Sequence, residues 1–155
     1  MKERNNQNVN KAVQVLIDNG KGWVLEHRQD KDGIFWPNRY GLWGGSFEDA
    51  DENKPINAAL REIFEESRLT EDDLEYKKMN VVEYKMKEFI HGPSAPTEVH
   101  YYYAKLKKDV AIHAYEGDVI KVFAYDVQFE NNHEFTPYVA DAVHMAEKIK
   151  NEAQA

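Results

Sequence analysis

Three glutamates in one short segment are the residues of this chain whose types and spacing could do chemistry. Glu62, Glu65 and Glu66 lie within the sequence REIFEE, at relative positions i, i+3 and i+4. Because an α-helix repeats every 3.6 residues, the three carboxylates share one helix face and repel one another. A hard divalent cation such as Mg²⁺ or Mn²⁺ takes oxygen ligands and reverses that repulsion. The cluster therefore indicates a metal site that holds phosphates.

Two glycines precede this acidic segment. Gly44 and Gly45 carry no side chain, so the backbone can approach the carboxylates closely, and the Gly44 carbonyl is a candidate metal ligand. An acidic helix face on its own is usually a solvated surface. One alternative to the metal site is therefore a plain acidic domain in which this spacing of glycines and glutamates arises by chance.

The stretch from Gly44 to Leu69 resembles the Nudix box, the signature sequence of the Nudix hydrolases. Arg61 and the glutamates of REIFEE fit the core of that signature without a gap. Gly45 fits its first glycine, and Leu69 fits its last aliphatic position.

The stretch departs from the signature at two places. The loop between Gly45 and Arg61 is two residues longer than in the family, so either Asp51 or Glu52 takes the place of the first conserved glutamate of the box. Such an insertion is tolerated because the entropy of loop closure grows slowly with length. Arg68 stands where the family has a glycine, and a side chain is strained there if the position requires positive φ.

The resemblance implies an enzyme that uses Mg²⁺, with Mn²⁺ as a substitute, to hydrolyse a pyrophosphate bond. The substrate would be a nucleoside diphosphate linked to another moiety, such as a nucleotide sugar, a dinucleoside polyphosphate or a modified nucleoside triphosphate. A catalytically weak nucleotide-binding module of the same fold is the alternative. The isomerase branch of the fold commonly relies on a cysteine, and this chain has none.

The resemblance also assigns roles to individual residues. Arg61 would orient the carboxylates that bind the metal. Glu116 lies in a Glu-Gly pair before a late strand, which is where many members of the family place a further metal ligand or base. The implied catalytic residues are Arg61, Glu62, Glu65, Glu66 and Glu116, and the implied metal ligands are Gly44, Glu62, Glu65, Glu66 and Glu116.

Substrate contacts are expected from the segments that lead into the box. Arg28 is a candidate phosphate ligand, because arginine binds phosphate through two hydrogen bonds, although arginine is also a common surface residue. Trp36 either stacks on a base or covers an edge of the core. Arg39 flanks the box and is a second candidate phosphate contact, and Gly45 allows the substrate to approach the backbone.

Composition limits the possible partners. The 155 residues carry a net charge of −8, which argues against nucleic acid or an anionic membrane as the main partner. Cysteine is absent and the histidines are scattered, so neither disulfides nor a zinc site are expected. No run of residues is apolar enough to cross a membrane. We expect a cytoplasmic protein that binds a small nucleotide. The resemblance adds a homodimer as a candidate assembly, because dimers are frequent in the family.

Periodicity predicts an α+β fold. Residues 1–10 are expected to be a flexible lead-in and residues 11–155 a single Nudix-like domain. Helices are predicted from Pro55 to about Arg68 and from Pro137 onward, capped by Asp51, Glu52 or Asn53 and by Thr136 respectively. The resemblance implies an α/β/α sandwich with a mixed β-sheet between helices. Strands are predicted at 12–17, 23–28, 41–45, 75–86, 98–106 and 119–125.

Overall fold

The computed structural model describes residues 10–29, 36–84, 97–115 and 119–154. Within these ranges the chain forms two α-helices, α2 (Pro55–Ser67) and α3 (Pro137–Gln154), and the short 3-10 helix η1 (Asp49–Asp51). The strands are β1 (Asn10–Asp18), β2 (Trp23–His27), β3 (Tyr40–Gly41), β4 (Trp43–Ser46), β5 (Leu74–Tyr84), β6 (Thr97–Leu106) and β7 (Ile120–Phe123).

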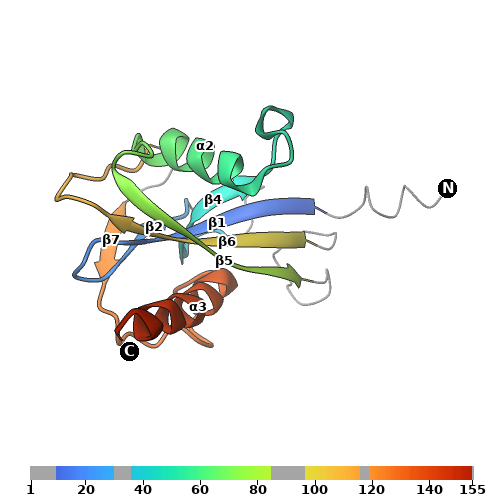
Figure 1. Ribbon diagram of the computed structural model, residues 1–155. Coiled ribbons are helices and arrows are strands. Elements are labelled where there is room, and N and C mark those ends of the chain that lie inside the picture. The colour runs from blue at the N-terminus through green and yellow to red at the C-terminus, as the bar shows by residue number, and fades with distance from the viewer. Residues whose placement is uncertain (1–9, 30–35, 85–96, 116–118, 155) are drawn as a thin grey trace.

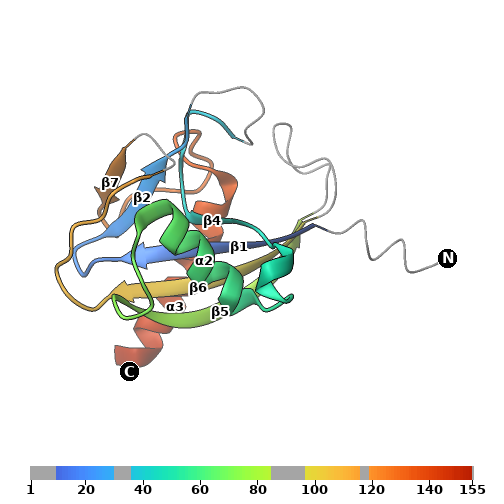
Figure 2. The same cartoon turned by 90° about the horizontal axis from the view of Figure 1, so that it is seen from above.

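The strands form one mixed sheet of seven strands, and α2 and α3 cover its opposite faces (Figure 1). Strand order is β3-β2-β1-β6-β5, with β4 paired to β1 and β7 paired to β2 (Figure 2). Strands β1 and β6 run parallel, and the other pairs are antiparallel. The expected α/β/α sandwich is confirmed, and β1 and β2 form a hairpin in which Ile17 lies opposite Val24.

Successive side chains of the central strands point to opposite faces of the sheet, and the core is therefore divided into two clusters. Val13 and Val15 of β1 face α2, where they pack with Ala58, Ala59 and Ile63. Leu16 of β1 faces α3, whose apolar side chains pack against it and against the aromatic residues of β2 and β6. The apolar side chains of both helices therefore lie against the sheet.

The sheet brings the glycines of the box next to the first strand. Strand β4 pairs with β1, so Gly44 lies opposite Gln14 and Gly45 lies opposite Val13. The prediction of one continuous strand over 41–45 was wrong, because Leu42 separates β3 from β4. Strand β3 pairs with β2 and β4 pairs with β1, so the chain changes partner at this residue.

The predicted helix caps also differ from the structure. Lys54 is the N-cap of α2 and contributes no side-chain hydrogen bond. Asp51 does not cap the helix because η1 and Arg61 take up its carboxylate. Helix α3 begins at Pro137 as predicted, but the buried hydroxyl of Thr136 has no hydrogen-bond partner within the described residues.

The predicted boundary between lead-in and domain falls within β1. Asn10, placed in the predicted lead-in, already belongs to β1, and residues 1–9 lie outside the described ranges. Residues 85 and 86 of a predicted strand also lie outside them. Among the described residues, no helix combines the length and the apolar character that crossing a membrane requires.

Candidate active site

Arg61 binds four carboxylates at the start of the acidic face of α2. Its Nε and Nη2 donate to the two carboxylate oxygens of Asp51, each over 2.9 Å. Its Nη1 lies 3.2 Å from Glu48, 3.1 Å from Glu62 and 3.2 Å from Glu65. Glu65 lies one helical turn after Arg61, and the two residues form an i, i+4 ion pair.

The longer loop places Asp51, rather than Glu52, against Arg61. Asp51 is only 2% exposed, and the hydrogen bonds from Arg61 hold the pKa of this carboxyl below its ordinary value. The same contact raises the pKa of Arg61. The side chain of Glu52 is 71% exposed and pairs with Lys54 on the surface. Of the two candidates, Asp51 is therefore the one that contacts the arginine of the box.

Three carboxylates around Arg61 lie close enough to share a cation. One oxygen from each of Glu48, Glu62 and Glu65 lies within 4.8 Å of the other two. The sequence reasoning included Glu62 and Glu65 but missed Glu48. Glu48 and Asp51 form a capping box on η1, but the usual sequence of that motif has Ser or Thr at the first position and Glu or Gln at the last, so no clear signal was present in the sequence. In the structure the Glu48 N–H donates to the Asp51 carboxylate over 2.8 Å.

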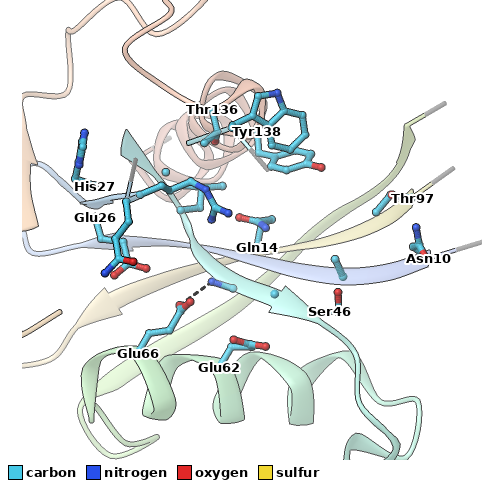
Figure 3. Close-up of a pocket in the computed structure, with 18 residues that line it drawn as sticks. Asn10, Gln14, Glu26, His27, Ser46, Glu62, Glu66, Thr97, Thr136 and Tyr138 are labelled. Carbon is cyan, nitrogen blue, oxygen red and sulfur yellow. Dashed lines mark hydrogen bonds between the residues drawn. The ribbon is translucent and has the colours of Figure 1, made fainter. Parts of the chain in front are cut away.

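Glu66 lies apart from that group and contacts the backbone of β4. The Gly44 N–H donates to Glu66 Oε1 over 3.0 Å (Figure 3). A side chain at Gly44 would overlap the carbonyl of Val13, since a Cβ built there lies 2.0 Å from that oxygen. Glycine at this position therefore lets β4 pass close to β1 and present its N–H to Glu66.

Gly45 makes room for the carboxylate of Glu62. A Cβ at Gly45 would lie 2.5 Å from Glu62 Oε2, well inside van der Waals contact. Glu62 and Glu66 are each only 8% exposed, although both are acidic. The glycines thus allow two buried carboxylates to lie directly under the backbone of β4.

A cavity of about 490 Å³ opens next to these carboxylates. In Figure 3, Glu62 and Glu66 project from α2 on one side, Thr136 and Tyr138 lie on the opposite side, and Gln14 lies between them. The other lining residues are Asn10, Ala12, Glu26, His27, Arg28, Gln29, Trp36, Gly41, Leu42, Gly44, Gly45, Ser46 and Thr97. The cavity therefore has an acidic side formed by α2 and an aromatic side that includes the start of α3.

The model of the NUDIX domain family matches residues 9–137 of this chain. The chain belongs to the NUDIX family. The resemblance to the Nudix box and the assignment to Nudix-type hydrolases are thereby confirmed. A comparison with curated proteins returned no match for this chain.

Solved structures share the NUDIX fold with this chain. An Ap4A hydrolase from C. elegans is 17% identical, with a TM-score of 0.72, over 92% of this chain and 98% of that one. A MutT NUDIX hydrolase from Burkholderia pseudomallei is 17% identical, with a TM-score of 0.64, over 88% and 97%. The dihydroneopterin triphosphate pyrophosphohydrolase of E. coli is 18% identical, with a TM-score of 0.58, over 74% and 80%.

The structure of this NUDIX domain brings most of the predicted substrate contacts together. Arg28, Trp36 and Gly45 line the cavity. Burial lowers the pKa of Arg28, and the nearby negative charges of Glu66 and Glu26 oppose that shift. Arg28 is therefore a partly buried cation that interacts with two acidic side chains of the cavity, Glu66 and Glu26.

Three described site residues that the sequence predicted, Arg39, Arg61 and Glu65, are not among the residues that line the cavity. The Nη1 of Arg39 donates to the carbonyl of Phe135 over 3.5 Å. Glu116 lies outside the described residues. Trp36 both lines the cavity and packs in the core, where its ring meets that of Tyr138 edge-on at 5.0 Å. The two alternatives considered for Trp36 are thus compatible in this fold.

Proposed function

We propose that this chain catalyses the Mg²⁺-dependent hydrolysis of a pyrophosphate bond in a nucleoside diphosphate linked to another moiety. The observation that supports this most is the position of Glu62 and Glu66. Both carboxylates are buried beneath the glycines of β4 and line one side of a cavity of about 490 Å³. A surface patch of acidic residues would have neither this burial nor this cavity.

The residues present fit a hard divalent cation. Glu48, Glu62 and Glu65 offer oxygen ligands within 4.8 Å of one another, and Glu66 and the carbonyl of Gly44 are the further proposed ligands. Mg²⁺ prefers such oxygen ligands and usually retains several waters. When bound, the cation would neutralise phosphate charge and polarise the phosphoryl group that is attacked. Mn²⁺ has the same ligand preference and is expected to replace it.

Arg61 keeps these carboxylates in place before any cation binds. Its Nη1 donates to Glu48, Glu62 and Glu65, which offsets the repulsion among their negative charges. Asp51 fixes the opposite edge of the guanidinium through two hydrogen bonds. We therefore assign Arg61 to the positioning of the ligands rather than to contact with substrate.

Other residues of the cavity would bind and orient the substrate. Arg28 remains protonated at neutral pH, as arginines in proteins do, and would contact a phosphate. The rings of Trp36 and Tyr138 form an apolar wall for the organic moiety. Glu62 and Glu66 are the box carboxylates that line the cavity, so one of them would accept the proton of the attacking water.

The substrate class is a proposal that the names of similar structures support. One of these structures is an Ap4A hydrolase, and another is a dihydroneopterin triphosphate pyrophosphohydrolase. Dinucleoside polyphosphates, nucleotide sugars and modified nucleoside triphosphates all contain the phosphate chain that the acidic side would hold. The net charge of −8 favours such small substrates over nucleic acid, and we further propose a cytoplasmic location and a homodimer.

A second candidate is a NUDIX domain that binds a nucleotide but turns it over weakly. The observation that favours it is the backbone of Arg68. Arg68 has φ +65°, in the left-handed region where a side chain is strained and where the family has glycine.

A hydrolysis panel separates the two candidates. Nucleoside triphosphates, ADP-ribose, sugar nucleotides and dinucleoside polyphosphates would be incubated with the protein and Mg²⁺ or Mn²⁺, and products would be identified by chromatography. Glu62→Gln and Glu66→Gln would be compared with Glu147→Gln, an exposed residue on α3. We expect turnover that requires metal and is lost only in the first two variants. Metal-dependent binding without turnover would instead establish the binding module.

A further inference from the structure

We propose that Arg68 is a positioning residue for the reaction, acting through Tyr115 on Glu66. The inference rests on the proposed hydrolase function. Arg68 follows the last residue of α2 and adopts φ +65° and ψ +10°. Glycine is the residue that this conformation favours, so an arginine here is retained at a cost to the backbone.

The guanidinium of Arg68 lies over two aromatic rings. Its Cζ is 5.1 Å from the ring centroid of Phe64 and 4.9 Å from that of Tyr115. Both distances are within the range of cation–π attraction, and a planar guanidinium stacks on rings better than an ammonium does. Phe64 belongs to α2, whereas Tyr115 lies in the segment between β6 and β7. Arg68 therefore links two parts of the chain that are distant in sequence.

The linked segment makes a backbone hydrogen bond to a residue of the candidate active site. The N–H of Tyr115 donates to the carbonyl oxygen of Glu66 over 2.8 Å. Carbonyls in the last turn of a helix lack partners within the helix, so this bond satisfies one of them. Glu66 is thus held at both ends, since its carboxylate accepts the N–H of Gly44 over 3.0 Å.

These contacts explain how an exposed arginine outside the cavity could affect the reaction. Phe64 and Tyr115 are 45% and 55% exposed, so the stacked cation contributes to holding Tyr115 against the helix end. Loss of this contact frees the Tyr115 N–H, and the carbonyl of Glu66 then loses a fixed partner. The expected consequence is a less well-defined position of the Glu66 carboxylate beside the substrate.

The conformation of Arg68 separates this role from a contribution to stability. Arg68→Gly removes the stacking contact but also removes the backbone strain, because glycine adopts φ +65° without cost. A residue that only stabilises the fold would lower the melting temperature when it is removed. A positioning residue at this site would lower kcat without such a loss.

The test compares Arg68→Gly and Arg68→Lys with Asn131→Gly. Asn131 also has positive φ, at +55°, and lies exposed in a loop far along the chain from the box. Melting temperature, kcat, KM and the amide hydrogen-exchange rate of Tyr115 would be measured for each. For Arg68→Gly we expect kcat to fall about fivefold with KM changed by less than about twofold. We also expect faster exchange at Tyr115 and no loss of melting temperature.

Each outcome decides the proposal. A smaller fall in kcat for Arg68→Lys, together with wild-type behaviour of Asn131→Gly, supports it, because lysine retains the cation but not the planar stack. Unchanged kcat and unchanged exchange at Tyr115 in Arg68→Gly would overturn it, and so would a fall in kcat matched by a fall in melting temperature. Absence of turnover in the wild-type protein would refute the proposed hydrolysis instead, and the Tyr115 exchange rate would still support or refute the contact.

Discussion

Asp51 receives two hydrogen bonds from Arg61, one from Nε and one from Nη2, each 2.9 Å long. Because both oxygens of the carboxylate are engaged, the plane of the guanidinium is fixed. The remaining nitrogen, Nη1, is then directed at Glu48, Glu62 and Glu65. The orientation of the candidate metal ligands thus depends on a residue that lies in the lengthened loop of the box.

Replacing Asp51 should therefore lower activity more than replacing its neighbour. Asp51→Asn retains the size of the buried side chain but leaves the partly buried guanidinium of Arg61 with a weaker acceptor. We expect kcat to fall between about 10-fold and 100-fold, as displaced catalytic groups do. Stability should fall by about 1–3 kcal/mol, the usual cost of disrupting a buried charged hydrogen bond.

Glu52→Gln is the matched control for Asp51→Asn. Its side chain is 71% exposed, so kcat and the melting temperature should match those of the wild-type protein. Steady-state kinetics and thermal denaturation measure both quantities. An equal loss of activity in the two variants would show that the box does not use Asp51 as the structure indicates.

Glu48 should contribute to metal affinity, although it lies outside the core of the box. Glu48→Gln removes one of three carboxylates that lie within 4.8 Å of one another. We expect the Mg²⁺ concentration for half-maximal activity to rise about tenfold, the lower end of the range for residues that support a metal site. Asp49→Asn, a change at the exposed neighbouring acid, should leave it unaltered. Titration of initial rates with Mg²⁺ would refute this role if both variants gave the same curve.

Gly45→Ala should lower kcat with little effect on stability, whereas Gly20→Ala should lower stability with no effect on kcat. The added Cβ at Gly45 would lie 2.5 Å from Glu62 Oε2, so the flexible carboxylate must move away from its position beside the cavity. We expect at least about a tenfold loss of kcat with a stability change below about 1 kcal/mol. At Gly20, φ is +88° and no atom lies within 4 Å of the added carbon.

A side chain at Gly20 should therefore cause backbone strain but no steric overlap. Its replacement by alanine should destabilise the protein by about 1 kcal/mol and leave kcat unchanged. Kinetics and urea denaturation of the two variants would show this crossed pattern. Full activity in Gly45→Ala would contradict the packing of Glu62 under the backbone of β4.

Asp18 should make the stability of the fold depend on pH. It is the last residue of β1, whereas the first residue of that strand, Asn10, lines the cavity. Burial alone would raise the pKa of Asp18, but hydrogen bonds from Tyr125, Tyr103 and the backbone of Gly20 lower it below its ordinary value of 3.8. Lys150 lies 3.4 Å from the same carboxylate. A carboxyl group with a depressed pKa stabilises the fold above its unfolded pKa, and this contribution is lost as the pH falls through the folded value.

Asp18→Asn should remove that pH dependence. Melting temperatures measured from pH 7 downward should fall steeply below about pH 4 in the wild-type protein and less steeply in the variant, which starts from a lower value at pH 7. Asp72→Asn, at an exposed position, serves as the control and should follow the wild-type curve. Parallel curves for Asp18→Asn and the wild-type protein would contradict the assigned role of the buried carboxylate.

The sequence predicted the parts of the site that lie close together along the chain. The acidic face of α2, the glycines before it and Arg61 share one segment, and helical periodicity is enough to place Glu62, Glu65 and Glu66 on neighbouring turns. The helix boundaries also agree, because Pro55 favours a first turn. Asp51 and Glu52 were not distinguished, since burial against Arg61 depends on the path of the loop.

The aromatic side of the cavity required the tertiary structure. Tyr138 belongs to α3, and its meeting with Trp36 depends on how that helix packs across the sheet. Periodicity gives the apolar face of a helix but not its partner in space. The same limit applies to 41–45, where the pattern of residues could not show that the chain changes partner from β2 to β1 at Leu42.

The most direct test of the central claim is the initial rate of pyrophosphate-bond hydrolysis as Mg²⁺ is titrated. It would be measured on the best substrate of the panel for the wild-type protein, Glu66→Gln and Glu147→Gln. Hydrolysis that requires Mg²⁺, is normal in Glu147→Gln and falls at least about 100-fold in Glu66→Gln is the result we predict. Hydrolysis that persists without a divalent metal, or that Glu66→Gln leaves intact, would contradict the assignment of the buried carboxylates to the reaction.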